Sequence, residues 1–166
     1  MRKYLINVAG GLDAIIMGPG SPHSLYARRK KMSKSAIYLV NPSTQVVAVD
    51  GVVMPGTIIR RFGPNLSLAG NGIQITGAGY YDIDASFNVA PTAEGEVTIT
   101  AYLDSTPIPG GVATSTVAAA GDYVNLSITS LVRESCPCCE GLKTLTFVLT
   151  GVESNITNSA IVIKKV

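Results

Sequence analysis

Strict alternation of apolar and polar side chains is the feature that most constrains the fold of this chain. From Tyr81 to Val89 every odd-numbered residue is apolar and every even-numbered residue is polar. The same period of two returns between Val97 and Asp104, after a short turn. Side chains of a strand point alternately to its two faces, so each segment predicts a strand with one buried and one solvated face. Together the two segments predict an antiparallel hairpin.

The chain from residue 36 onward continues in the same style. Short alternating or β-branched segments are separated by turns rich in proline and glycine, and none carries the apolar period of an amphipathic helix. Roughly eight to ten short strands at such spacing are typical of a sandwich or barrel. The chain is therefore expected to be all-β, an antiparallel β-sandwich. Segments 63–71, 105–111 and 151–158 are expected to be loops, and Asp50-Gly51 a tight hairpin turn.

The apolar positions of these strands predict the core. Hydrophobic residues make up 46% of the 166 residues and charged residues 14%, a balance that supports a folded core. The three cysteines lie together in one loop, so no long-range disulfide is available and packing must hold the fold. Ala160 to Ile163 is apolar on both sides, as expected of a central strand or one covered by a neighbour. The strand core is expected to contain Ile83, Phe87, Val97, Ile99, Leu103, Leu126, Ile128, Leu145, Phe147 and Leu149.

Charge divides the chain unevenly. Residues 1–61 hold nine basic and two acidic residues, whereas the remainder holds four basic and nine acidic ones. Residues 1–35 are expected to form an extended N-terminal arm, because Gly18 to Pro22 breaks regular structure, and residues 36–166 a single domain. A solvated arm, or one folded against its own domain, is the alternative to an arm that docks on an acidic partner. The predicted docking residues are Arg28, Arg29, Lys30 and Lys31.

The arm predicts neither a membrane nor a nucleic-acid partner. Asn7 and Asp13 interrupt the apolar stretch that follows Arg2 and Lys3, and the stretch is too short to span a bilayer. It is therefore interpreted as mature sequence. Basic residues also contact nucleic-acid phosphates, but only Tyr26 lies beside the basic run and the domain is acidic.

Catalytic and metal-binding patterns are weak. The single histidine, His23, lies in the arm, where a cysteine or serine would have to reach it. We therefore expect no enzyme activity and no cofactor. Within Cys136-Pro137-Cys138-Cys139 the cysteines are interpreted as reduced or partly oxidised structural thiols. An intersubunit disulfide, and a zinc site built from Cys136, Cys138 and Cys139, are the alternatives.

Three motifs resemble one family of jelly rolls. The segment Gly77-Ala78-Gly79-Tyr80-Tyr81-Asp82-Ile83 is similar to the central glycine-tyrosine-tyrosine strand of the tumour-necrosis-factor/complement-C1q-like (TNF/C1q-like) jelly rolls. Pro91-Thr92-Ala93-Glu94-Gly95 matches the turn that follows this strand in bacterial and phage members. Leu103 to Gly110 resembles the end of the next strand. The likeness covers about residues 36–166 and looks closest to jelly-roll virion proteins of tailed phages.

The resemblance implies a TNF/C1q-like jelly roll that forms a homotrimer, with subunits packed edge to face about a threefold axis. It also implies a phage virion structural protein, a capsid decoration or head-fibre protein on the capsid surface. The arm would then dock on the major capsid protein or another virion protein. Support for a trimer comes from residues that alternation would expose, which are Tyr80, Tyr102, Tyr123 and Val148. The three tyrosines are the predicted trimer contacts, and ordinary half-buried tyrosines in a sheet are the alternative.

A second function fits the same resemblance, the receptor- or glycan-binding head of a fibre or a spore-surface protein. Binding would then fall to segments 63–71 and 105–111. The sequence lacks the Gly-X-Y stalk of spore-surface collagen-like proteins, and only Phe62 supplies an aromatic ring beside either segment.

Overall fold

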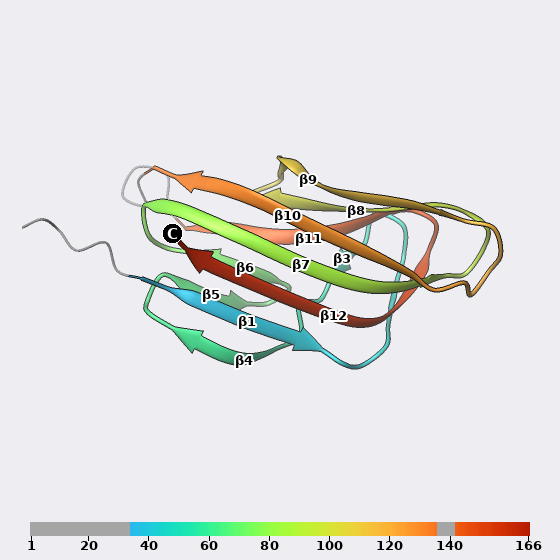
Figure 1. Cartoon of the computed structure of the whole chain (residues 1–166), viewed down its shortest axis with the longest axis horizontal. Helices are drawn as coiled ribbons and strands as arrows, with labels where there is room; N and C mark the ends of the chain where they lie inside the picture. Colours follow the sequence, from blue (N-terminus) through green and yellow to red (C-terminus); the bar gives the residue numbers. More distant parts are fainter. Residues whose placement is uncertain (1–33, 136–141) are drawn as a thin grey trace, which may run out of the picture. The chain divides into compact units, whose positions relative to one another are not determined.

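The computed structural model describes residues 34–135 and 142–166. Twelve strands and no helix occupy these residues, so the predicted all-β class is confirmed (Figure 1). Three sets of residues discussed above lie outside the described residues: the predicted docking residues Arg28 to Lys31, the histidine His23, and the cysteines Cys136, Cys138 and Cys139. The division into an arm of residues 1–35 and a domain of residues 36–166 stays a prediction.

The strands form two antiparallel sheets that pack face to face (Figure 1). Sheet A has the order β10-β7-β12-β1-β4, with β2 beside β12. Its strands are β1 (Ala36–Asn41), β2 (Gln45–Val47), β4 (Thr57–Phe62), β7 (Gly79–Pro91), β10 (Val124–Glu134) and β12 (Ser154–Lys165). Sheet B has the order β5-β6-β11-β8-β9, with β3 beside β11. Its strands are β3 (Val52–Val53), β5 (Leu66–Ala69), β6 (Gly72–Ile75), β8 (Gly95–Leu103), β9 (Thr106–Val117) and β11 (Lys143–Gly151).

The core lies between the two sheets, as the alternation requires. Phe87 of β7 and Phe147 of β11 meet there, with their ring centroids 5.2 Å apart. Nine of the ten predicted core residues are buried, and Leu103 is half-buried against the same cluster. Each sheet therefore contributes its apolar face to one shared interior.

The predicted hairpin of residues 81–89 and 97–104 is wrong in its pairing. β7 pairs with β10 and β12 in sheet A, whereas β8 pairs with β9 and β11 in sheet B. The turn after Pro91 carries the chain from one sheet to the other. Alternation fixes which face of a strand is buried, but it does not fix which strand lies beside it.

The Asp50-Gly51 turn also joins the two sheets. Asp50 has a φ of 61°, and the amide of Gly51 donates to the carbonyl oxygen of Ala48 over 2.9 Å, so the turn is tight as predicted. Its flanking strands do not pair with each other, however, because β2 pairs with β12 and β3 pairs with β11. The predicted hairpin is therefore wrong here as well.

The segment 105–111 is a strand rather than the expected loop. The reversal falls at Asp104 and Ser105, whose φ values of 48° and 67° suit a two-residue hairpin turn. β9 then begins at Thr106 and forms the edge of sheet B. A proline has no backbone N–H to donate to a neighbouring strand. It is therefore tolerated on an edge strand, where the outer side of the strand needs no such hydrogen bond.

Two other expected loops are also partly extended. Leu66 to Ala69 forms β5 within segment 63–71, and Ser154 begins β12 within segment 151–158. In β5, Ser67 separates buried Leu66 from half-buried Leu68. In β12, Asn155 separates buried Ser154 from buried Ile156. Both patterns are too short to be convincing in the sequence. The apolar segment 160–163 does lie in a central strand, since β12 is flanked by β7 and β1.

The two-ring contact in the core gives a direct test of this architecture. We expect Phe87→Ala to lower the free energy of unfolding by about 3–5 kcal/mol, because it removes a fully buried ring from between the sheets. Val46→Ala is the control, since Val46 is 69% exposed and its truncation should change stability by less than about 0.5 kcal/mol. Urea unfolding followed by circular dichroism measures both. Equal losses in the two variants would contradict the assigned core.

Candidate interaction surfaces

The three predicted trimer tyrosines lie on separate parts of the domain. Tyr80 is the second residue of β7, lies on the outer face of sheet A and is 46% exposed. It packs against Arg133, whose guanidinium carbon lies 5.8 Å from the ring centroid. Tyr102 is half-buried in β8, opposite Thr146 of sheet B. Tyr123 is 74% exposed in the segment before β10, about 30 Å along the strands from Tyr80.

This separation does not by itself decide their role. A threefold interface joins two different surfaces of each subunit, so residues that are far apart in one chain can meet across it. The assignment of Tyr80, Tyr102 and Tyr123 to a trimer interface stays a prediction.

The outer face of sheet A carries an apolar stripe that the sequence analysis did not single out. It consists of Tyr38 and Val40 from β1 and Val162 and Ala160 from β12, which pair as Tyr38 with Val162 and Val40 with Ala160. These residues point away from the core, because their neighbours along both strands are the buried ones. The sequence signal was the segment that is apolar on both sides.

The other half of the same face is polar. The side-chain amide of Asn125 donates to Ser86 over 3.0 Å and to Asn88 over 2.8 Å, joining β10 to β7. Asp84 accepts from the Thr129 hydroxyl over 3.2 Å and lies 3.7 Å from the ammonium of Lys164. The face is therefore divided into a hydrogen-bonded polar region and an apolar stripe.

Strand β4 is exposed along its whole length. All six of its residues are exposed, and among the strands of residues 34–135 and 142–166 it pairs only with β1, at the edge of sheet A. Ile58 is 39% exposed, Ile59 47% and Phe62 66%. Arg60 and Arg61 lie between them. An exposed edge strand that carries large apolar residues beside arginines is unusual on a solvated surface and is typical of a protein interface.

Charge is segregated along the strands. We call the end of the sandwich where β1 begins and β12 ends the Lys34 end, and the opposite one the Pro91 end (Figure 1). All seven basic residues of the described chain lie in the half nearer the Lys34 end: Lys34, Arg60, Arg61, Arg133, Lys143, Lys164 and Lys165. Four acidic residues share that half: Asp82, Asp84, Asp104 and Glu134.

The Pro91 end is acidic without a compensating base. Its turns are held together by backbone hydrogen bonds from Thr92 to Glu153, over 2.9 Å, and from Gly121 to Pro91, over 2.8 Å. Among the described residues this end carries five carboxylates and no lysine or arginine. The five are Asp50, Glu94, Glu96, Asp122 and Glu153.

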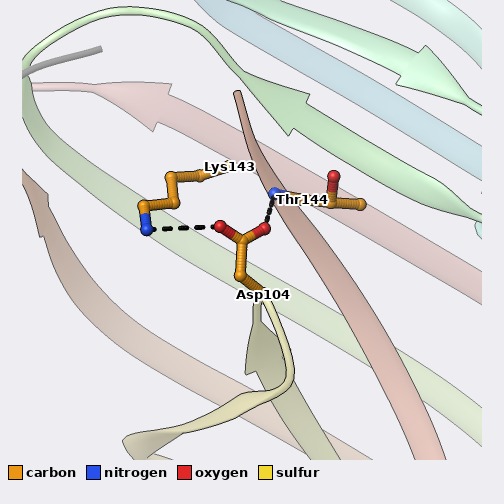
Figure 2. Close-up of polar contacts among 3 residues, drawn as sticks. All are labelled: Asp104, Lys143 and Thr144. Atoms are coloured by element: carbon orange, nitrogen blue, oxygen red, sulfur yellow. Dashed lines mark hydrogen bonds and ion pairs between the residues drawn. The ribbon is translucent and has the colours of Figure 1, made fainter. Parts of the chain in front are cut away.

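Asp104 fixes the β8–β9 turn to the neighbouring strand at the Lys34 end. Its carboxylate accepts the backbone N–H of Thr144 over 2.7 Å and lies 3.2 Å from the ammonium of Lys143, as Figure 2 shows. Its own amide donates to the carbonyl of Thr144 over 2.9 Å. These contacts give Asp104 a structural role in the motif from Leu103 to Gly110, and that role is enough to explain an acidic residue at this position.

Tyr81 and Lys165 form a second polar contact at the same end. The Tyr81 hydroxyl donates to the carbonyl of Gly77 over 2.5 Å, and the Lys165 ammonium lies 5.7 Å from the centroid of the Tyr81 ring. Burial raises the pKa of Tyr81, the nearby charge of Glu134 raises it further, and the hydrogen bond to Gly77 lowers it. Burial lowers the pKa of Lys165.

An open pocket of about 400 Å³ lies between the β8–β9 turn and the end of β10. Pro107, Ile108 and Leu131 supply apolar walls, and Glu134 and Lys143 supply charges. Lys143 is already bound to Asp104. Within residues 34–135 and 142–166, no group of three His, Cys, Asp or Glu side chains is placed to hold a metal ion. In the same ranges, no helix has the length and apolarity needed to cross a membrane.

Comparisons with known proteins identify the fold but no family. No family model matches the sequence, and no curated protein matches it. Similar solved structures are jelly rolls of the TNF/C1q-like class, which confirms the predicted fold class. Murine APRIL is one, with a TM-score of 0.63 and 10% sequence identity over 81% of this chain and 100% of that chain.

Two further solved structures are similar to this chain in fold. The globular domain of zebrafish complement 1qA has a TM-score of 0.55 and 7% identity, over 81% of this chain and 97% of that chain. PRD1 vertex protein P5 has a TM-score of 0.53 and 16% identity, over 80% of this chain and 96% of that chain. None of the three is named as an enzyme. At these identities the likeness concerns the fold.

The Asp104 contacts predict a graded response to substitution. We expect Asp104→Ala to lower the free energy of unfolding by about 1–3 kcal/mol. The substitution removes the acceptor for the Thr144 N–H, and it places alanine at a left-handed φ that favours Asp, Asn or Gly. Asp104→Asn keeps an acceptor oxygen and tolerates that φ, so its loss should stay below about 1 kcal/mol. Thermal or urea unfolding distinguishes them. A loss of stability in the Asn variant as large as that in the Ala variant would show that the ion pair with Lys143 dominates.

Proposed function

We propose that this chain is a trimeric structural protein of a phage virion, a capsid decoration or head-fibre protein mounted on the capsid surface by its N-terminal arm. The observation that carries the proposal is the one-sided charge of the domain. The basic Lys34 end is where residues 1–33 join, and those residues add six basic side chains and one acidic one. The fold shared with a phage vertex protein, PRD1 P5, supports a virion location.

The trimer is supported by the uncovered stripe on sheet A. Tyr38, Val40, Ala160 and Val162 are half-buried and form an apolar surface in the middle of a sheet, with polar residues to one side. Apolar centres with polar surroundings are typical of subunit interfaces. In a ring of three, this face of one subunit would meet a different surface of the next.

Docking is assigned to Arg28, Arg29, Lys30 and Lys31, and the partner is the major capsid protein or another virion protein. An excess of one sign of charge at one end orients a molecule toward a surface of the opposite sign before contact is made. The acidic Pro91 end would face away from such a surface, so the same charge pattern sets both attachment and orientation. The proposal gives the chain no catalytic role and no cofactor.

Two matched substitutions test the trimer. We expect the purified protein to have a mass of about 52 kDa by light scattering after size exclusion, three chains of 17.3 kDa. Val162→Glu should shift it toward the monomer mass, because it places a charge in the middle of the stripe. Val49→Glu, between β2 and β3, is the control and should leave the trimer intact, since Val49 is 48% exposed and belongs to none of the predicted contacts. A trimer mass that is unchanged in Val162→Glu would contradict the role of the stripe.

Attachment is tested by removing the arm. Deletion of residues 1–34 should leave a folded trimer that no longer cosediments with virions lacking this protein, because the strands and core begin beyond that point. A full-length variant with Arg28, Arg29, Lys30 and Lys31 all replaced by Gln should lose most of the attachment too. If the truncated protein attaches as well as the full chain, the arm has no part in docking.

A further inference from the structure

The exposure of β4 follows from where it lies. Its partner β1 has one face in the core, whereas β4 extends the sheet by one more strand and has all six residues exposed. In the part of the chain that the structure describes, nothing pairs with its outer side. The strand therefore presents apolar side chains, charged side chains and free backbone groups together.

The two arginines of β4 are not neutralised within the described residues. The ion pairs found there join Lys143 to Asp104 and Lys164 to Asp84. The recorded polar contact of the Arg60 side chain runs to the carbonyl oxygen of the preceding Ile59, over 3.3 Å. Guanidinium groups bind carboxylates through paired N–H donors, so Arg60 and Arg61 offer two sites for acidic side chains.

A bulge in β4 disfavours pairing with another copy of the same strand. Tyr38 pairs with Arg60 and Leu39 with Ile58, so Ile59 is an extra residue in the ladder. Bulges twist an edge strand and interrupt the row of donors and acceptors that a second edge would need. Pairing of two β4 strands would also bring four arginines together, which like-charge repulsion opposes.

The arm of the same chain is an equally poor occupant. β4 ends beside the point where the described chain begins: Ala36 pairs with Phe62, and a side chain on Gly63, whose φ is 77°, would collide with the backbone of Lys34. The point where the arm joins the domain is therefore beside the end of β4. However, seven of the eight charged side chains in residues 1–35 are basic, and these would be repelled by Arg60 and Arg61.

We propose that β4 is a second docking surface, which binds an acidic protein surface through Arg60 and Arg61 and covers Ile58, Ile59 and Phe62. This rests on the proposed function and specifies the partner's chemistry: carboxylates beside an apolar patch. Aliphatic and aromatic side chains on either side of the arginines favour a protein over a nucleic acid, whose backbone offers phosphates without an apolar patch. Because β4 ends beside the residues where the arm joins the domain, we expect one partner surface to contact both.

The test is a charge reversal with a matched control. Full-length Arg60→Glu/Arg61→Glu is compared with Glu94→Lys/Glu96→Lys, which changes the same number of charges at the Pro91 end. Virions lacking this protein are the probe, and binding is measured by cosedimentation over a range of protein concentrations. We expect the β4 variant to bind at least tenfold more weakly and the control to bind like the wild type. Light scattering should give the trimer mass for both.

The outcomes separate this inference from the proposed function. Wild-type protein that does not bind virions overturns both. Wild-type binding that is unchanged in the β4 variant overturns the role of β4 alone and leaves docking to the arm. Loss of the trimer in the β4 variant would show that β4 contacts another copy of the chain. Binding of a DNA duplex by the wild type but not by the β4 variant would show that the partner offers phosphates. Either result overturns the proposal.

Discussion

Burial of one apolar face from each sheet is the interaction on which the rest of the structure depends. Phe87 and Phe147 meet across the interior, surrounded by the aliphatic residues of both sheets. Within the described residues no helix covers either sheet, so the outer faces are left to solvent or to other molecules. The division of roles follows from this: inward positions hold the fold, and outward positions on sheet A and β4 are available for contacts.

The outward positions form a pattern with a direction. Basic residues gather toward the Lys34 end and uncompensated acidic residues at the Pro91 end. The apolar stripe of Tyr38, Val40, Ala160 and Val162 runs across the middle of sheet A, between these ends. A stripe in the middle suits lateral contact between parallel subunits, and charged ends suit orientation on a surface. The two features can therefore operate together without competing for the same residues.

The sequence predicted the class, the core and the central position of residues 160–163, because a period of two and the identity of the apolar residues determine which faces are buried. It did not predict that the turns after Pro91 and at Asp50-Gly51 cross between sheets, since pairing depends on residues far away in the chain. The start of β9 was missed because its prolines suggest a loop unless the strand is known to be an edge.

The candidate surfaces were predicted less well, for a related reason. Strand order must be known before Tyr38, Val162 and β4 can be assigned to an exposed surface. Whether a residue points outward or lies at an edge depends on the whole sheet. The proposed orientation on the virion is tested most directly by electron microscopy of particles carrying gold-labelled protein. Gold at Val166, near the Lys34 end, should lie closer to the shell than gold at Ala119, near the Pro91 end. The reverse order, or labelled protein absent from the capsid, would contradict the account.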